Sequence, residues 1–84
     1  MNSPLLTFEI NDAMESIEIF ANAEGVAELI CFLELALRTN DHQHLMTPDW
    51  GGDELSSELQ GQSNRIVHHV KIFPLGKSSD QATG

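Results

Sequence analysis

Two segments near the N-terminus alternate apolar and polar residues with a period of two. They are residues 6–10, with the sequence LTFEI, and residues 17–21, with the sequence IEIFA. This period is typical of β-strands that bury one face, and it places Thr7 and Glu9 on the opposite, polar face. Turn-forming residues, Asn11-Asp12-Ala13, follow the first segment. The pattern predicts an antiparallel β-hairpin.

A helical period begins after the second strand. Asn22 is a favourable N-cap residue, and Glu24 lies in the first turn, where a carboxylate favours the helix dipole. Arg38 in the last turn and Asn40 just beyond it mark the end of the helix. Gly25 costs the helix up to ~1 kcal/mol relative to alanine, and nothing in the sequence explains it. One apolar stripe is predicted to pack on the strands, and it consists of Val26, Leu29, Ile30, Leu33, Ala36 and Leu37.

The second half of the chain contains two further strand signals. Residues 42–46 form a short third strand that ends at Pro48 and the following glycines. Residues 53–62 are polar and predict a loop, with one helical turn over residues 54–59. Residues 65–73, with the sequence RIVHHVKIF, form the strongest strand because they are rich in β-branched side chains.

These elements predict an α+β fold, a single ββαββ domain in residues 1–75, with an antiparallel sheet and one helix packed on one face. Residues 76–84, with the sequence GKSSDQATG, have nothing to bury and are expected to form a flexible C-terminal tail. If the helical stripe is buried, Leu33→Ala should cost about 2–5 kcal/mol of stability.

The charge of the chain narrows the classes of partner. Thirteen acidic and 4 basic residues give a net charge of −9 over 84 residues. Four basic residues are too few to neutralise a nucleic acid or to hold the protein on an anionic membrane. The apolar run 26–37 is interrupted by Glu28 and Glu34 and is too short to span a bilayer. We therefore expect a soluble, cytoplasmic protein with a basic protein partner.

Residues that could support catalysis lack the arrangement that catalysis requires. Cys31 is the single cysteine, so the chain can form neither an internal disulfide nor a cysteine-based zinc ribbon. It lies in mid-helix near Glu28 and Glu34, and neighbouring carboxylates are not the electropositive surroundings that a nucleophilic thiolate needs. Ser56 and Ser57 have no accompanying nucleophile motif. The sequence predicts no enzymatic activity and no cofactor.

Histidines form the one candidate metal set. His42 and His44 share one face of the third strand, and His69 can join them if the last strand pairs beside it. A small histidine-rich metal-binding module is therefore the alternative function. The other interpretation of these side chains is a half-exposed polar face.

The loop after the third strand is the least generic part of the chain. It contains the single tryptophan, Trp50, two glycines, and the carboxylates of Asp49, Asp53 and Glu54. Trp50 can cap one end of the sheet, or it can anchor a basic protein surface with the carboxylates as a charged rim. The residues alone favour neither interpretation.

A second surface is predicted on the helix. Leu35 lies opposite the predicted core stripe with Phe32 on its flank, and Phe20 and Phe73 point outwards from their strands. These side chains predict an apolar patch that is either covered by a loop or tail or used for a homodimer or another partner.

Residues 42–56, with the sequence HQHLMTPDWGGDELS, resemble the immunity protein 32 family of bacterial polymorphic toxin systems. Residues 67–73 (VHHVKIF) and 19–25 (IFANAEG) share the resemblance, which covers most of residues 8–73. It implies an antitoxin-like protein that binds and neutralises a cognate toxin domain. Together with the charge of −9, it suggests that an acidic surface occludes a basic toxin groove.

Overall fold

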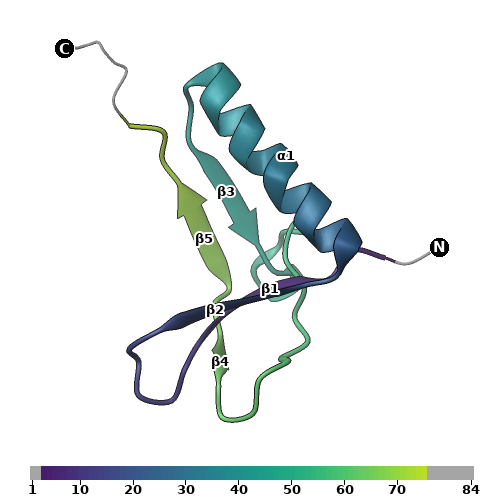
Figure 1. The fold of residues 1–84 in the computed structure, drawn as a ribbon, viewed down its shortest axis with the longest axis vertical. Coiled ribbons are helices and arrows are strands. Elements are labelled where there is room, and N and C mark those ends of the chain that lie inside the picture. The colour runs from purple at the N-terminus through teal and green to yellow at the C-terminus, as the bar shows by residue number, and fades with distance from the viewer. Residues whose placement is uncertain (1–2, 76–84) are drawn as a thin grey trace.

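The computed structural model describes residues 3–75 of the chain, so the predicted tail over residues 76–84 lies outside the described residues. Strands β1 (Leu6–Ile10) and β2 (Ile17–Ala21) precede helix α1 (Ala23–Thr39) (Figure 1). Strand β3 (Gln43–Met46), a 3-10 helix (Pro48–Trp50), and strands β4 (Arg65–Ile66) and β5 (His69–Ile72) follow. The predicted ββαββ order and α+β class are confirmed, with the last strand divided in two.

The predicted hairpin is confirmed in position. Strands β1 and β2 pair antiparallel from Leu6 opposite Ala21 to Ile10 opposite Ile17. The side-chain oxygen of Asn11 accepts hydrogen bonds from the backbone N–H groups of Glu15 and Ser16, at 2.7 and 3.0 Å. This side chain therefore closes the turn between the two strands.

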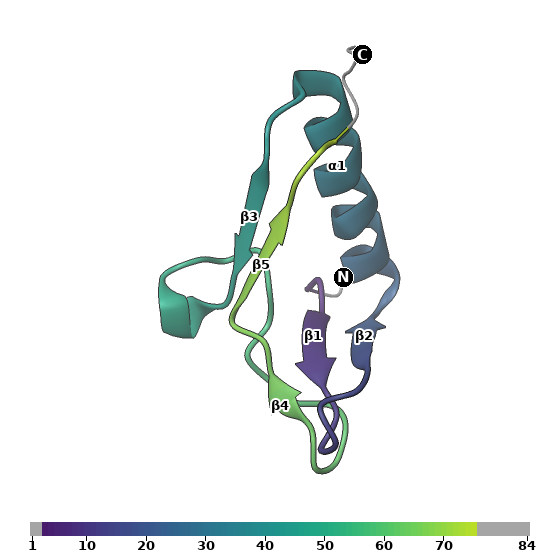
Figure 2. The same ribbon diagram turned by 90° about the vertical axis from the view of Figure 1, so that its left-hand side faces the viewer.

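The predicted strand over residues 65–73 divides because it belongs to two sheets. Its first part, β4, pairs with β1 in a three-stranded sheet of order β2-β1-β4, and β5 pairs with β3. At the break, the N–H of Val67 donates to the carbonyl of Phe8, and the carbonyl of His68 accepts from the N–H of Thr47. Figure 2 shows the result, with the β3–β5 pair running alongside α1 and the other strands gathered at the far end of the molecule.

Helix α1 begins and ends where the sequence predicts. The side chain of Asn22 caps it by accepting from the N–H of Gly25 at 2.8 Å, and Asn40 ends it in the left-handed conformation, with φ 55°. The same Asn22 oxygen accepts from the N–H of Leu5 at 2.9 Å, so the cap also ties α1 to the chain before β1. Within residues 3–75, no helix is both long enough and apolar enough to cross a membrane.

The predicted buried stripe of α1 is wrong for four of its six residues. Among them only Leu29 and Ala36 turn inwards, joined by Gly25 and Phe32. The helix buries its small residues because they allow a close approach to the strands: a Cβ at position 25 would lie 1.8 Å from the carbonyl oxygen of Leu5. The four stripe residues left exposed are Val26 (47%), Ile30 (49%), Leu33 (48%) and Leu37 (80%).

Two other expectations change because the side of α1 that faces the core differs from the predicted one. Phe32 and Leu35 are half-buried, so the prediction that they form an exposed patch is wrong. Phe73, which was assigned to the same patch, is 58% exposed. The 2–5 kcal/mol expected for Leu33→Ala applies to a buried leucine and not to this half-exposed one.

The apolar core is small, and the loop between the 3-10 helix and β4 contributes one of its residues. Within residues 3–75, the cluster of buried residues is Leu6, Leu45 and Leu55, and Val70 and Ile72 pack against it from β5. Leu55 lies in the segment predicted as a polar loop, and that segment has no helical turn over residues 54–59. Two strand residues expected to pack under the helix, Ile17 and Ile19, are instead 55% and 52% exposed.

The cap by Asn22 predicts a measurable loss of stability. Asn22→Ala removes the acceptor for two backbone N–H groups, so we expect the free energy of unfolding to fall by about 1–2 kcal/mol. Asn22→Asp retains the acceptor and is expected to lose less. Urea denaturation of both variants measures the difference, and equal losses would contradict the cap.

Candidate functional site

The loop that carries Trp50 is held in a tight turn. The N–H of Trp50 donates to the carbonyl of Thr47 at 2.9 Å, and that of Gly51 donates to the carbonyl of Pro48 at 3.0 Å. Pro48 begins the 3-10 helix, where its missing N–H costs no hydrogen bond. Gly51 has φ 89°, a conformation that glycine adopts without strain. The T-P-D-W-G sequence therefore sets the direction in which Trp50 points.

Thr47 connects this turn to the break between β4 and β5. It is fully buried, and its hydroxyl lies 2.7 Å from Nδ1 of His68. The imidazole of His68 is in turn stacked under Trp50, with ring centroids 5.8 Å apart and planes 7° apart. Backbone and side-chain contacts thus position the indole from both sides.

Trp50 is held in place but open to solvent. Its side chain is 58% exposed, so its interpretation as a buried cap of the sheet is wrong. A large aromatic side chain in a fixed orientation loses little entropy on binding, which suits it to a contact with another protein.

The predicted acidic rim separates into two kinds of carboxylate. Asp49 and Asp53 are exposed, and Asp49 accepts a hydrogen bond of 3.3 Å from the hydroxyl of Ser57. Glu54 is half-buried, and its carboxylate accepts from the N–H of Met46 at 3.1 Å. Glu54 therefore fastens the loop to β3, whereas Asp49 and Asp53 are free to face a partner.

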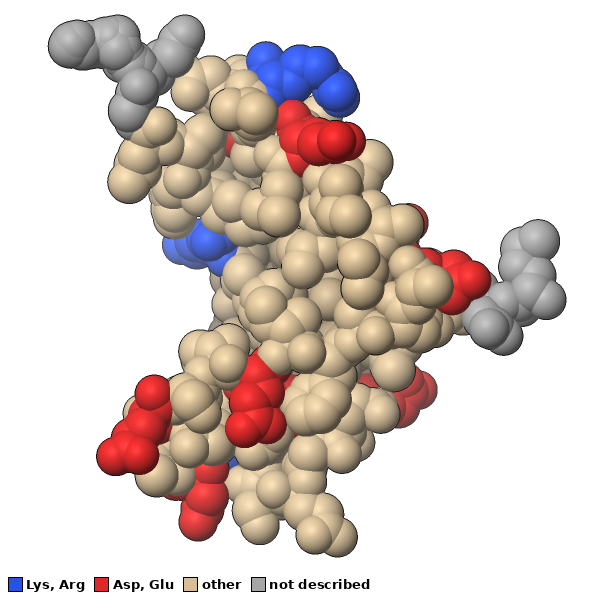
Figure 3. Space-filling model, in the orientation of Figure 1, with Lys and Arg blue, Asp and Glu red and all other residues tan. Residues whose placement is uncertain are grey.

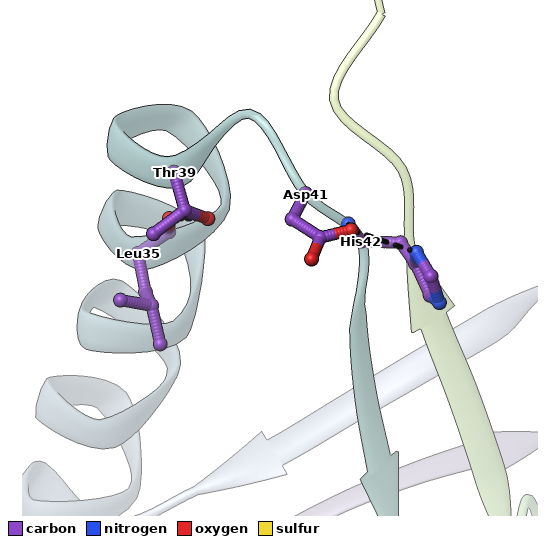
Figure 4. A network of polar contacts seen from close by, with 4 residues as sticks. All are labelled: Leu35, Thr39, Asp41 and His42. Carbon is purple, nitrogen blue, oxygen red and sulfur yellow. Dashed lines mark hydrogen bonds and ion pairs between the residues drawn. The ribbon is translucent and has the colours of Figure 1, made fainter.

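The histidines predicted to gather do come together on the outer face of β3 and β5. Nδ1 of His44 lies 2.9 Å from Nε2 of His69, and the ring of His42 lies 4.7 Å from that of His44. His42 enters β3 from the turn after α1, with its Nδ1 3.1 Å from the carboxylate of Asp41 (Figure 4).

This arrangement is a hydrogen-bonded pair and not a metal centre. Two nitrogen ligands of a tetrahedral zinc ion, each about 2.0–2.1 Å from the metal, would lie ~3.4 Å apart. At 2.9 Å the nitrogens of His44 and His69 share one proton instead. Across the described part of the chain, no group of three or more histidine, cysteine or acidic residues is arranged to hold a metal ion.

Aromatic rings continue on both sides of the histidine pair. Neighbouring ring centroids are 4.7–6.1 Å apart along the whole series. We call this series the ring row, and its members in spatial order are Phe73, His42, His44, His69, Trp50 and His68.

The electrostatics of the ring row favour a neutral His44. Loss of hydration and the positive charges at His42, His69 and Lys71 lower the pKa of His44, and the carboxylate of Asp41 opposes them.

The sequence did not reveal a buried polar site on strand β1 of the three-stranded sheet. Thr7 and Glu9 are fully buried, because the loop before β4 covers the face of β1 that the alternation assigned to solvent. The Glu9 carboxylate accepts from the N–H groups of Gln60 and Gly61 and the side chain of Asn64, at 2.8–3.0 Å. The hydroxyl of Thr7 donates to it at 2.8 Å.

These donors determine the protonation state of Glu9. Burial alone would raise the pKa of Glu9, but the hydrogen bonds from Asn64, Gln60, Gly61 and Thr7 outweigh it and hold the pKa below its usual value. A general acid or base that acts near neutral pH needs the opposite shift. The site is therefore suited to holding the loop in place and not to proton transfer.

Comparison with known families assigns the chain to one of them. Residues 16–70, well over half of the chain, match the family described as Immunity protein 32. The chain belongs to this family, which confirms the resemblance found in the sequence. The family indicates a non-catalytic role and a toxin as protein partner. No curated protein and no solved structure matches the chain.

Proposed function

We propose that this protein binds a cognate bacterial toxin domain in the cytoplasm and neutralises it by covering its active surface. Membership of the Immunity protein 32 family supports the class of function. The observation that carries the proposal for the surface is the fixed, exposed indole of Trp50 beside the exposed carboxylates of Asp49 and Asp53.

The indole and the carboxylates would act at different stages of binding. With a net charge of −9, the protein attracts a basic toxin surface from a distance, which raises the association rate. Trp50 then fills a pocket on the toxin, and arginine side chains of the toxin can stack on the neighbouring rings of His68 and His69. Binding of this kind needs neither a catalytic group nor a cofactor, and the toxin is blocked for as long as the complex lasts.

Trp50→Ala is expected to weaken toxin binding by about 30-fold, equivalent to about 2 kcal/mol, mainly through faster dissociation. The melting temperature should hardly change, because the side chain is already 58% exposed. The measurement is surface plasmon resonance with an inactive form of a cognate toxin domain.

Phe73→Ala is the matched control, since Phe73 is also 58% exposed and lies at the opposite end of the ring row. It should leave the affinity within a few-fold of the original value. Asp49→Asn combined with Asp53→Asn should slow association and reduce its dependence on salt. A folded Trp50→Ala protein with unchanged affinity would contradict this loop as the binding surface.

A further inference from the structure

Two histidines on neighbouring strands share a hydrogen bond beside the indole of Trp50. Nδ1 of His44 on β3 lies 2.9 Å from Nε2 of His69 on β5, and the ring centroids of His69 and Trp50 are 6.1 Å apart. The antiparallel pairing of β3 with β5 fixes both backbones, so the two imidazoles are held side by side. His44 is exposed and His69 is half-buried, so protons reach the pair from solution.

The number of protons on the pair decides whether this contact exists. A neutral imidazole has one N–H donor and one acceptor nitrogen, whereas an imidazolium has two donors and no acceptor. The contact between His44 and His69 therefore persists in the neutral pair, and also when one ring is charged, because the other ring still accepts. When both rings are charged, two N–H groups and two positive charges face each other, and the contact opens.

His68, the other histidine beside the indole, responds differently to acid. Its Nδ1 lies 2.7 Å from the hydroxyl of Thr47, which can donate to a neutral imidazole or accept from a charged one. The stack of His68 under Trp50 is therefore compatible with both protonation states. Of the two histidines beside the indole, His69 is the one whose contact is broken by acid.

We propose that the His44–His69 pair is a proton switch that weakens toxin binding in acid. This inference rests on the proposed function of the Trp50 loop and adds its regulation. Once both rings are charged, the imidazolium of His69 is released from His44 next to the indole. The released imidazolium repels basic side chains of the toxin and competes with them for the face of the indole.

The charged groups on β3 and β5 determine where in the pH range the switch acts. The strand register places Lys71 directly opposite His44, and the ring of His42 lies 4.7 Å from that of His44 on the other side. Loss of hydration lowers the pKa of His44, and the positive charges at His42, His69 and Lys71 lower it further. The carboxylate of Asp41 opposes them. The second proton therefore enters the pair below the usual histidine pKa of 6.5.

The other elements around the pair contribute carboxylates or apolar side chains. The loop after β3 carries the carboxylates of Asp49, Asp53 and Glu54. On the opposite face of β3, Leu45 belongs to the core cluster against which Leu29 and Phe32 of α1 pack. The chain has 4 lysine and arginine residues against 13 acidic ones, and Figure 3 shows acidic groups predominating over basic ones on the side that carries α1. Protonated histidines are therefore a large change in the charge that a basic toxin meets.

A pH titration followed by NMR tests the switch without toxin. Imidazole nitrogen chemical shifts of the full chain, recorded from about pH 8 to about pH 4.5, report the protonation of each ring. We expect His44 and His69 to take up protons in two steps more than about one pH unit apart, because the first charge opposes the second. In His44→Gln, the glutamine oxygen accepts from His69 at every pH, so His69 should titrate in a single step. Independent titration of His44 and His69 in the original protein would overturn the proposal.

Surface plasmon resonance at two pH values tests the effect on binding. Between about pH 7.5 and about pH 5.5, the dissociation constant for an inactive form of a cognate toxin domain should rise at least about tenfold. His44→Gln should bind as tightly as the original protein at neutral pH, because it leaves Trp50, His68 and His69 in place, and it should lose most of this rise. Comparison of the two proteins cancels any titration of the toxin itself.

His42→Gln is the matched control, because it removes a neighbouring titratable ring and leaves the His44–His69 pair intact. It should retain the pH dependence of the original protein, and circular dichroism verifies the fold of each variant. An equal rise in the dissociation constant for the original protein and His44→Gln would overturn the switch and leave the Trp50 contact in place. Unchanged affinity of Trp50→Ala at neutral pH would contradict the proposed function, and its regulation with it, whatever the NMR titration shows.

Discussion

Glu9→Ala is expected to lower the free energy of unfolding by about 3 kcal/mol or more, a large share of the stability of a small domain. The substitution removes the single carboxylate on which the N–H groups of Gln60 and Gly61 and the amide of Asn64 converge. Each donor left buried without an acceptor costs ~1–3 kcal/mol. Urea denaturation measures the loss, and amide hydrogen exchange should show faster opening at Gln60 and Gly61.

Glu18 provides the matched control for Glu9. It lies directly opposite Glu9 on the neighbouring strand and also accepts from the side chain of Asn64 at 3.0 Å, but it is exposed. Glu18→Ala should cost less than about 1 kcal/mol, because water replaces the lost acceptor. Equal losses for the two substitutions would contradict a buried network centred on Glu9.

The same network predicts how stability depends on pH. The pKa of Glu9 is lower in the folded chain than its usual value, so its stabilisation is complete above the pKa of the unfolded chain. It is lost as the pH falls through the lower pKa of the folded chain. The difference in stability between the original protein and Glu9→Gln should therefore be largest near neutral pH and shrink in acid. A constant difference over that range would show that the charge of Glu9 does not contribute.

Gly25→Ala is expected to destabilise the protein by about 3 kcal/mol, although alanine is the better helix former. The added Cβ would lie 1.8 Å from the carbonyl oxygen of Leu5, and backbone atoms cannot move aside as a flexible side chain can. That carbonyl also accepts the N–H of Asn22, so moving it disturbs the helix cap. Thermal and urea unfolding measure the effect.

Replacing an exposed alanine of α1 by glycine gives a reference value for the stability change expected of Gly25→Ala. Ala27 is exposed on α1, so Ala27→Gly should cost about 1 kcal/mol through helix propensity alone. Alanine is then favourable at position 27 and unfavourable at position 25. If Gly25→Ala instead stabilised the chain, the close packing of α1 on the residues before β1 would be wrong.

Local patterns in the sequence were sufficient to define most of the elements. The alternation in residues 6–10 and 17–21 predicted the hairpin, and Asn22 and Asn40 marked both ends of α1. The run HLMTPDWGG carried the resemblance to the family and marked the loop of Trp50, but it left open whether the indole is buried or exposed. Side-chain alternation also predicted that His42 and His44 share one face of the third strand, and the pairing of β3 with β5 brings His69 beside them. These features depend on residues close together in the chain or on the period of a single element.

Only the tertiary structure decided which sides of these elements are covered. Helix α1 carries apolar residues on two adjoining sides, and its period does not distinguish them. The close approach permitted by Gly25 selected one side, which also buries Ala36, and left Leu33 exposed. Glu9 is buried because residues more than 50 positions away fold over β1 and supply donors that no local pattern reveals. The strand over residues 65–73 divides because its two ends pair with different partners, and at the break His68 meets Thr47 and supports Trp50. Burial and pairing of this kind depend on contacts between distant segments, so they appear only when the whole chain is folded.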